Sequence, residues 1–407
     1  MIKEILARVL EHRYIWRTAG FTELSELYIS NLLRVFALSI LVVFVPFYMY
    51  QNGYPAFSIF TMYGLVFVAR AISDIAAAFA VARFGPKHIL IVSCFLQILS
   101  AGLFLTIPAH HWPVAVLSIP WGVAVSSYFI AYHVAFSKVK HTEHAGKELG
   151  TMQVMEKLGG VAGPIVGGVV GTVLGAHYIF LLATIILVAS LWPLFQTSEP
   201  VRTKQILRYS NLPLQKIKYD LESYVALGVE NVICINVWPF YVALFALSGG
   251  VYAKLGAVTA SAVLVSIFAA YFAGRLIDSH KGYRLLRISA VLNAILYIFR
   301  PLANGIWPVL GINLVNESIT TGYRIPYIKG MYVAADDLPG YRICYISTME
   351  CTASIAKGTL FFLLALLATL FPVRSVLVFG FGVAALGSLL IMLERFKGLR
   401  QRSTIKS

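Results

Sequence analysis

Charged side chains that could carry chemistry stand inside the long apolar stretches of this sequence. A charged group within a bilayer costs about 3 kcal/mol or more unless it is paired or faces water, so each one is a candidate functional residue. The ionisable residues in these stretches are Arg34, Arg70, Asp74, His133, Glu156, Glu230, Glu317, Arg324, Glu350 and Lys357. Both signs are present, which allows ion pairs that form and break.

Five of these residues are candidates for an inner gate. By residue count most of the charges fall toward one side of the membrane, where pairs of opposite sign can hold that side closed. The gate candidates are Arg34, Arg70, Asp74, Glu156 and Glu350. The alternative is a set of fixed pairs within one part of the chain. Arg70 and Asp74, four residues apart on one helix, are the first such pair to consider.

A second group of residues is placed to bind a substrate near mid-depth. Only Glu317 and Lys357 lie near the middle of their stretches, and Asn313 shares a helical face with Glu317 because four residues separate them. The predicted substrate-binding residues are Asn236, Asn313, Glu317 and Lys357. Glu317 is the first choice for a carboxylate that binds and releases a proton, and Glu230 is the second. Hydrogen bonds between helices are the alternative role for the asparagines.

The composition sets the class of protein. Of the 407 residues 59% are hydrophobic and 13% are charged, with a mean hydropathy of +0.78, which is typical of a polytopic membrane protein. A helix needs about 20 apolar residues to cross a bilayer, and only helices or closed barrels satisfy their backbone there. Twelve helical spans are expected, at 27–50, 56–82, 88–108, 112–136, 150–174, 177–196, 222–246, 254–277, 285–303, 306–330, 346–371 and 374–393.

The net charge of +15 is distributed by topology. Most Lys and Arg fall in alternate loops and in the tail from Arg395, while the intervening loops near 51–56, 108–112 and 175–177 contain none. The positive-inside rule therefore places both termini in the cytoplasm of a multi-pass protein of the cell membrane. The basic charge then implies contact with lipid headgroups and no nucleic-acid partner.

No metal, cofactor or disulfide is expected. The four cysteines are scattered, and the histidine pairs His110–His111 and His141/His144 have no further ligands at a recognisable spacing. Residues 1–24 contain charges throughout, so they are no signal peptide. Ile2, Leu6 and Val9 share a face there, which predicts an amphipathic segment on the inner membrane surface.

Two halves of the chain resemble each other. "VPFYMY" (45–50) returns as "WPFYVA" (238–243), and Met155-Glu156 returns as Met349-Glu350 at nearly the same offset. These matches predict two pseudo-symmetric six-helix bundles, at 25–196 and 222–393. A cytoplasmic linker at 197–221 joins them, and a basic cytoplasmic tail follows at 394–407.

The fifth expected span carries glycine at every fourth position. Such a row leaves a bare ridge on a helix, so another backbone can approach closely and pack against it. The residues predicted to serve helix packing and rocking are Gly159, Gly163, Pro164, Gly167, Gly168 and Gly171. A purely structural role is the alternative.

Two motifs resemble signatures of the major facilitator superfamily. Its loop signature, a glycine, three residues, an acid, then a glycine followed by a base, is matched by Gly274, Asp278, Gly282 and Arg284, and the first-half copy keeps Arg83, Gly85 and Lys87. The glycines and Pro164 of the fifth span are similar to the signature of the proton-coupled antiporters in that superfamily. The arginine of their fourth-helix signature is missing, because Ser118 and Trp121 stand there.

The resemblance implies a monomeric secondary transporter that moves a small molecule by alternating access, with proton-coupled export as the favoured direction. It does not identify the substrate. A transport-inactive or lipid-translocating relative is the alternative, and a membrane-embedded enzyme is less favoured because no catalytic motif is found.

Overall fold

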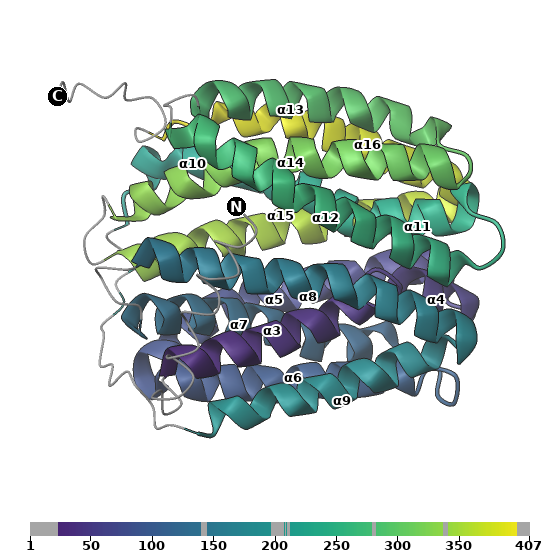
Figure 1. Cartoon of the computed structure of the whole chain (residues 1–407), viewed down its shortest axis with the longest axis horizontal. Coiled ribbons are helices and arrows are strands. Elements are labelled where there is room, and N and C mark those ends of the chain that lie inside the picture. Colours follow the sequence, from purple (N-terminus) through teal and green to yellow (C-terminus); the bar gives the residue numbers. More distant parts are fainter. Residues whose placement is uncertain are drawn as a thin grey trace, which may run out of the picture.

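The computed structural model describes residues 23–139, 145–196, 207, 209, 212–278, 282–336 and 341–396. All regular elements in these residues are helices, which run side by side along the long axis of the molecule (Figure 1). The expected all-α class is therefore confirmed. The amphipathic segment expected within 1–24 lies almost wholly outside the described residues, as does most of the tail.

The helices of the first half begin with an interrupted pair. They are α3 (Glu23–Leu41), α4 (Val45–Gln51), α5 (Ala56–Phe84), α6 (Pro86–Leu105), α7 (Val114–Val139), α8 (Ala145–Val173) and α9 (Ala176–Leu194). The second half comprises α10 (Leu214–Val232), η3 (Ile233–Val237), α11 (Trp238–Tyr241), η4 (Val242–Ala246), α12 (Val251–Asp278), α13 (Gly282–Phe299), η5 (Arg300–Leu302), α14 (Ile306–Asp336), α15 (Arg342–Leu370), α16 (Val373–Leu390) and η6 (Ile391–Leu393).

Ten helical stretches of the described residues are long and apolar enough to cross a membrane. Each of the twelve expected spans overlaps a helix, but two overlap helices outside these ten. In α8 only Leu158–Val173 forms an apolar stretch within the described side chains. In α14 the charges of Glu317, Arg324 and Lys329 lower the mean hydropathy.

The largest boundary difference concerns α10, which begins at Leu214 inside the expected linker. Pro213 caps this helix, and its first turns alternate lysines with residues such as Ile217, which is buried. An amphipathic start of this kind is too polar for a hydropathy pattern to show. The expected tail also starts in packed structure, because the Phe396 ring lies 5.0 Å from the Tyr327 ring of α14.

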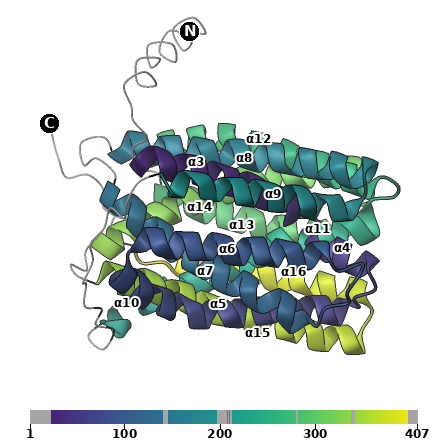
Figure 2. The same cartoon turned by 90° about the horizontal axis from the view of Figure 1, so that it is seen from below.

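Helices of the same half make most of the contacts. In the first half α3 packs on α8 and α9, and α7 packs on α5 and α6; in the second half α14 packs on α12 and α13, and α10 packs on α15 and α16. Two further pairs, α5 with α15 and α8 with α12, join helices of different halves. Figure 1 shows α15 and α12 between the two halves, and Figure 2 shows α12 beside α8 at one edge of the molecule and α15 beside α5 at the opposite edge.

The repeated Pro-Phe-Tyr motif interrupts one helix in each half. A turn at 42–44 precedes Pro46 at the start of α4, and the π-helix η3 precedes Pro239 at the start of α11. The two tyrosines then make matching contacts: Tyr48 donates to the carbonyl of Phe104 at 3.2 Å, and Tyr241 donates to the carbonyl of Pro301 at 2.8 Å. Equivalent positions in the sequence therefore have equivalent partners.

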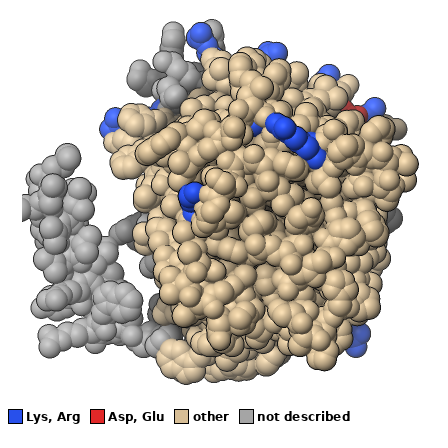
Figure 3. All heavy atoms as spheres, turned by 90° about the vertical axis from the view of Figure 1, so that its right-hand side faces the viewer, with Lys and Arg blue, Asp and Glu red and all other residues tan. Residues whose placement is uncertain are grey.

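The two ends of the molecule differ in charge. Arg83 and Lys87 flank the turn at Gly85, between α5 and α6, and this end is here named the basic end; it lies on the left in Figure 1. The opposite end, seen in Figure 3, is covered mostly by uncharged residues with a few Lys and Arg. Arg284 is exposed, and the side chain of Asp278 in the loop signature lies outside the described residues.

The glycines of α8 pack against two helices, as expected for a bare ridge. A Cβ on Gly163 would lie 2.4 Å from the Cβ of Ser39 in α3, and a Cβ on Gly168 would lie 2.7 Å from the carbonyl oxygen of Tyr252 in α12. From the other side, a Cβ on Gly256 would lie 2.2 Å from the carbonyl oxygen of Pro164. Backbone therefore meets backbone between α8 and α12, one of the two junctions between the halves.

A methyl group at this junction should destabilise the protein. We expect Gly256→Ala to lower the melting temperature in detergent, since overpacking typically costs about 1–3 kcal/mol. Gly382→Ala is the matched control, because a Cβ at that helical position has no atom within 4 Å. Equal melting temperatures for the two variants would contradict this account of the glycines.

Candidate functional site

One face of α5 meets one face of α15 with the same spacing. Tyr63, Phe67, Arg70 and Asp74 follow each other at intervals of four, three and four residues, and so do Glu350, Ser354, Lys357 and Phe361. Side chains at these intervals lie along one stripe of a helix. These eight residues are named the α5–α15 seam below.

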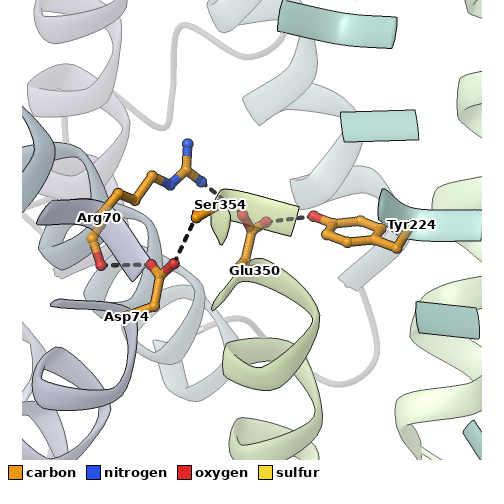
Figure 4. Close-up of polar contacts among 6 residues, drawn as sticks. Arg70, Asp74, Tyr224, Glu350 and Ser354 are labelled. Carbon is orange, nitrogen blue, oxygen red and sulfur yellow. Dashed lines mark hydrogen bonds and ion pairs between the residues drawn. The ribbon is translucent and has the colours of Figure 1, made fainter. Parts of the chain in front are cut away.

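An ion pair at the centre of the seam joins the two halves. The Nη2 of Arg70 lies 2.7 Å from the Oε2 of Glu350, and their side chains are 12% and 17% exposed. The Tyr224 hydroxyl of α10 donates to the other oxygen of Glu350. Figure 4 shows the three side chains pointing toward one another from three different helices. Two of the predicted gate residues are thus in direct contact.

Asp74 has other partners. The Ser126 hydroxyl of α7 donates to its Oδ1 at 2.5 Å, and the Ser354 hydroxyl of α15 donates to its Oδ2 at 3.2 Å. Among the described residues the ion pair of Arg70 is therefore with Glu350 and not with Asp74, its neighbour on the same helix. The two serines were not predicted, although Ser354 lies on the same helical stripe as Glu350 and Lys357.

Lys357 lies on the seam two helical turns beyond Glu350. It is 7% exposed, and its Nζ lies 5.6 Å from the centre of the Phe67 ring. Gly228 of α10 makes room for it, because a Cβ there would lie 2.6 Å from the Lys357 Cε. The side chain is thus enclosed by α5, α10 and α15.

Aromatic rings close the seam toward the end opposite the basic end. The Phe361 ring stacks on Phe67 at 5.8 Å and on Tyr63 at 5.0 Å. Phe60 continues this layer and contacts Phe240 of α11 at 6.3 Å. The charged part of the seam therefore lies between an apolar layer and the basic end.

A second polar cluster lies within the second half. Glu230 is 2% exposed, and its Oε1 accepts hydrogen bonds from Tyr297 at 2.8 Å and from Asn293 at 3.0 Å. Arg300 is fully buried, and its Nη2 donates to Asn316 Oδ1 at 2.5 Å. Arg300 lies in the η5 turn that follows α13, and its guanidinium carbon lies 3.9 Å from the centre of the Tyr297 ring.

The remaining predicted residues lie apart from the seam. Asn313 accepts a hydrogen bond from Trp238 at 2.6 Å, Asn236 is buried in η3, and Glu317 is half-buried on α14. Arg34 donates to Gln97 at 3.0 Å and lies 3.4 Å from the Tyr128 ring centre, so its described contacts are with α6 and α7. The side chains of His133 and Glu156 lie outside the described residues. The seam thus unites Arg70, Asp74, Glu350 and Lys357.

Comparison with known proteins assigns the family. The model of the Major Facilitator Superfamily matches residues 27–340. The chain belongs to the Major Facilitator Superfamily. No curated protein matches the sequence at a significant level.

Solved structures of this fold include several transporters. The nucleoside transporter NupG matches with a TM-score of 0.69 at 13% identity, covering 91% of this chain and 98% of that one. A POT family transporter in complex with a thioalcohol conjugated peptide has a TM-score of 0.70 at 13% identity, covering 90% and 95%. A D-xylose-proton symporter has a TM-score of 0.65 at 13% identity, covering 92% and 97%. These likenesses show that this superfamily member shares their fold.

Removal of both members of the ion pair should cost less than the sum of the two single removals. We expect Arg70→Gln and Glu350→Gln each to lower the melting temperature, because breaking a buried pair typically costs about 3–5 kcal/mol. The double variant should lose less than the sum of the two. Lys218→Gln is the control, since Lys218 and Glu222 form an exposed pair at 3.7 Å. Additive losses would show that the two charges are not coupled.

Proposed function

We propose that this chain is a secondary active transporter that moves a small molecule across the membrane by alternating access. Two six-helix units, at 25–196 and 222–393, would rock against each other about the α5–α15 and α8–α12 junctions. The observation that carries this proposal is the Arg70–Glu350 pair, which joins helices of different halves at 2.7 Å. The matching contacts of Tyr48 and Tyr241 support the duplicated architecture.

The Arg70–Glu350 ion pair is a suitable contact to break and re-form in each transport cycle. Two charges lose hydration when they are buried, and their mutual attraction offsets much of that loss. When the seam opens to water, the two charges regain their hydration and lose their mutual attraction. The free energies of the closed and open states can therefore differ by only a few kcal/mol. A ligand can then shift the balance between them. An apolar junction of the same area would favour the closed state much more strongly.

The glycine contact between α8 and α12 suits the same motion. Backbone faces backbone at Gly256 and Pro164, so no side chain separates the two helices at that point. The two helices can change their angle about this close contact. The α5–α15 junction thus provides an ion pair that can break, and the α8–α12 junction provides a close backbone contact about which the halves can rotate.

We place the basic end in the cytoplasm, which makes both termini cytoplasmic in a protein of the cell membrane. Arg83 and Lys87 at the α5–α6 turn, together with the uncharged character of the opposite end, support this orientation. The ion pair then closes the cytoplasmic side, and the aromatic layer around Phe361 closes the outer side. The linker at 197–221 would also be cytoplasmic.

Proton-coupled export remains part of the proposal, with Glu317 as first choice for the proton carrier. Glu317 is half-buried on α14, whereas Glu230 is 2% exposed and accepts hydrogen bonds from Tyr297 and Asn293. A carboxylate that exchanges protons in each cycle needs a route to water. The family and its transporter structures also favour a transporter over an enzyme.

Transport in proteoliposomes tests both parts of this proposal. We expect the wild-type protein to exchange at least one labelled solute from a panel of nucleosides, sugars, peptides and organic acids by counterflow. An imposed pH gradient should drive accumulation in wild type. Glu317→Gln should abolish that accumulation yet leave counterflow intact, because exchange needs no net proton movement.

The controls separate the two claims. Glu230→Gln should have a smaller effect on pH-driven accumulation than Glu317→Gln, and Lys216→Gln at an exposed site should have none. Unchanged pH-driven accumulation in Glu317→Gln would remove the proton role and leave the transporter proposal standing. A folded, reconstituted protein that exchanges no solute in the panel would contradict transport itself.

A further inference from the structure

Three hydrogen-bond donors of the α5–α15 seam have no hydrogen-bond partner among the described residues. Among the described residues no acceptor lies within hydrogen-bond or ion-pair distance of the Lys357 Nζ, and Lys357 is 7% exposed. The buried Tyr63 hydroxyl and the Nε of Arg70 also have no hydrogen-bond partner in this described part of the chain. Three donors of the seam are thus available at the same time.

The acids of the seam are already engaged. Both carboxylate oxygens of Glu350 accept hydrogen bonds, from Arg70 and from Tyr224. Both oxygens of Asp74 accept hydrogen bonds from serines, Ser126 and Ser354. Among the described residues no ion pair joins either acid to Lys357, although both acids share the seam with it.

A cation in such a position requires an explanation. Burial of an ammonium group that makes no direct ion pair or hydrogen bond costs several kcal/mol, and proteins retain such a cost mainly at functional sites. The contact of Nζ with the Phe67 ring compensates only in part, because a cation–π contact contributes about 1–2 kcal/mol. The missing partner is a group that accepts several hydrogen bonds and carries negative charge.

We propose that the transported molecule carries an oxyanion, a carboxylate or a phosphate, which binds to the Nζ of Lys357. The Nε of Arg70 is a further donor on the same seam. The hydroxyl of Tyr63, about two helical turns away on α5, is a donor for another polar group of the same molecule. This inference rests on the proposed transport function and narrows its substrate to organic anions. Phe67 and Phe361 would face the apolar part of the same molecule.

Binding at this place also affects the ion pair. Arg70 engages Glu350 through Nη2, so an oxyanion at Nε shares the same guanidinium. A guanidinium that divides its charge between two carboxylates holds each one less tightly. The substrate therefore weakens the contact that closes the basic end, which links its binding to the opening of that end.

Matched compounds test the charge requirement. Purified full-length protein in detergent is titrated with a hexuronate, its neutral hexose and its amino sugar, with a nucleoside monophosphate and its nucleoside, and with an N-acetyl amino acid and its amide. Binding is followed by calorimetry and by the shift in melting temperature. We expect at least one oxyanion to bind at least tenfold more tightly than its neutral partner, and the amino sugar not to bind.

Variants then assign the site. Lys357→Gln should weaken that binding tenfold or more, Lys357→Arg should retain most of it, and Gly228→Ala should weaken it because a Cβ there displaces the Lys357 side chain. Lys216→Gln serves as the exposed control. Lys357→Met should melt no lower than wild type, since it removes a buried charge that makes no direct ion pair. If Lys357→Gln fails to fold, Lys357→Arg and Gly228→Ala still decide the assignment.

Two results would overturn the inference. One is binding of neutral or cationic compounds that equals oxyanion binding and survives Lys357→Gln. The other is the absence of oxyanion binding across the panel. The transport proposal is separable from both, because counterflow of a neutral solute that is unaffected by Lys357→Gln would reject the anion site and keep the transporter.

Discussion

A single buried ion pair between helices from different halves is the contact on which the rest of the account depends. Arg70 and Glu350 meet in a chain that is 59% hydrophobic, where each charge alone would be costly. Their pairing stabilises the closed contact between α5 and α15 without making it permanent, since water can replace the partner when the helices separate. Tyr224 donates to the same carboxylate from a third helix, so α10 also contributes to this contact.

The two junctions between the halves use opposite chemistry. At the α5–α15 seam, charged and aromatic side chains meet, and the contact is specific and breakable. At the α8–α12 junction, Gly168 and Gly256 bring the backbones of the two helices into close contact. A transporter whose halves rock needs both kinds of contact, because one junction must respond to ligand binding and the other must allow the halves to move. The sequence places the two kinds of contact in separate pairs of helices.

Much of the architecture could be predicted from the sequence, because apolar length and loop charge determine where helices can cross a membrane. Hydropathy missed the start of α10, where lysines alternate with buried residues such as Ile217. The repeated Pro-Phe-Tyr motif pointed to equivalent positions, and Tyr48 and Tyr241 do make equivalent contacts. The match of Glu350 with Glu156 stays a prediction, since the side chain of Glu156 lies outside the described residues.

The candidate site was predictable in its residues but not in its pairings. The cost of intramembrane charge selected Arg70 and Glu350, yet spacing along one helix favoured Asp74 as the partner of Arg70. Spacing gives the face of a helix and cannot say which other helix packs on it. Arg300 was not among the predicted candidates, because the η5 turn in which it is buried leaves no signal in hydropathy.

The distance between the halves at the basic end tests the central claim most directly. Spin labels at Phe84 on α5 and Lys216 on α10, in a variant without the four native cysteines, report this distance by pulsed electron resonance; labels at Phe84 and Phe195, both in the first half, serve as the control. We predict that Glu350→Gln shifts the Phe84–Lys216 distribution to longer distances and leaves Phe84–Phe195 unchanged. Identical distributions in wild type and Glu350→Gln would show that the ion pair does not hold the basic end closed.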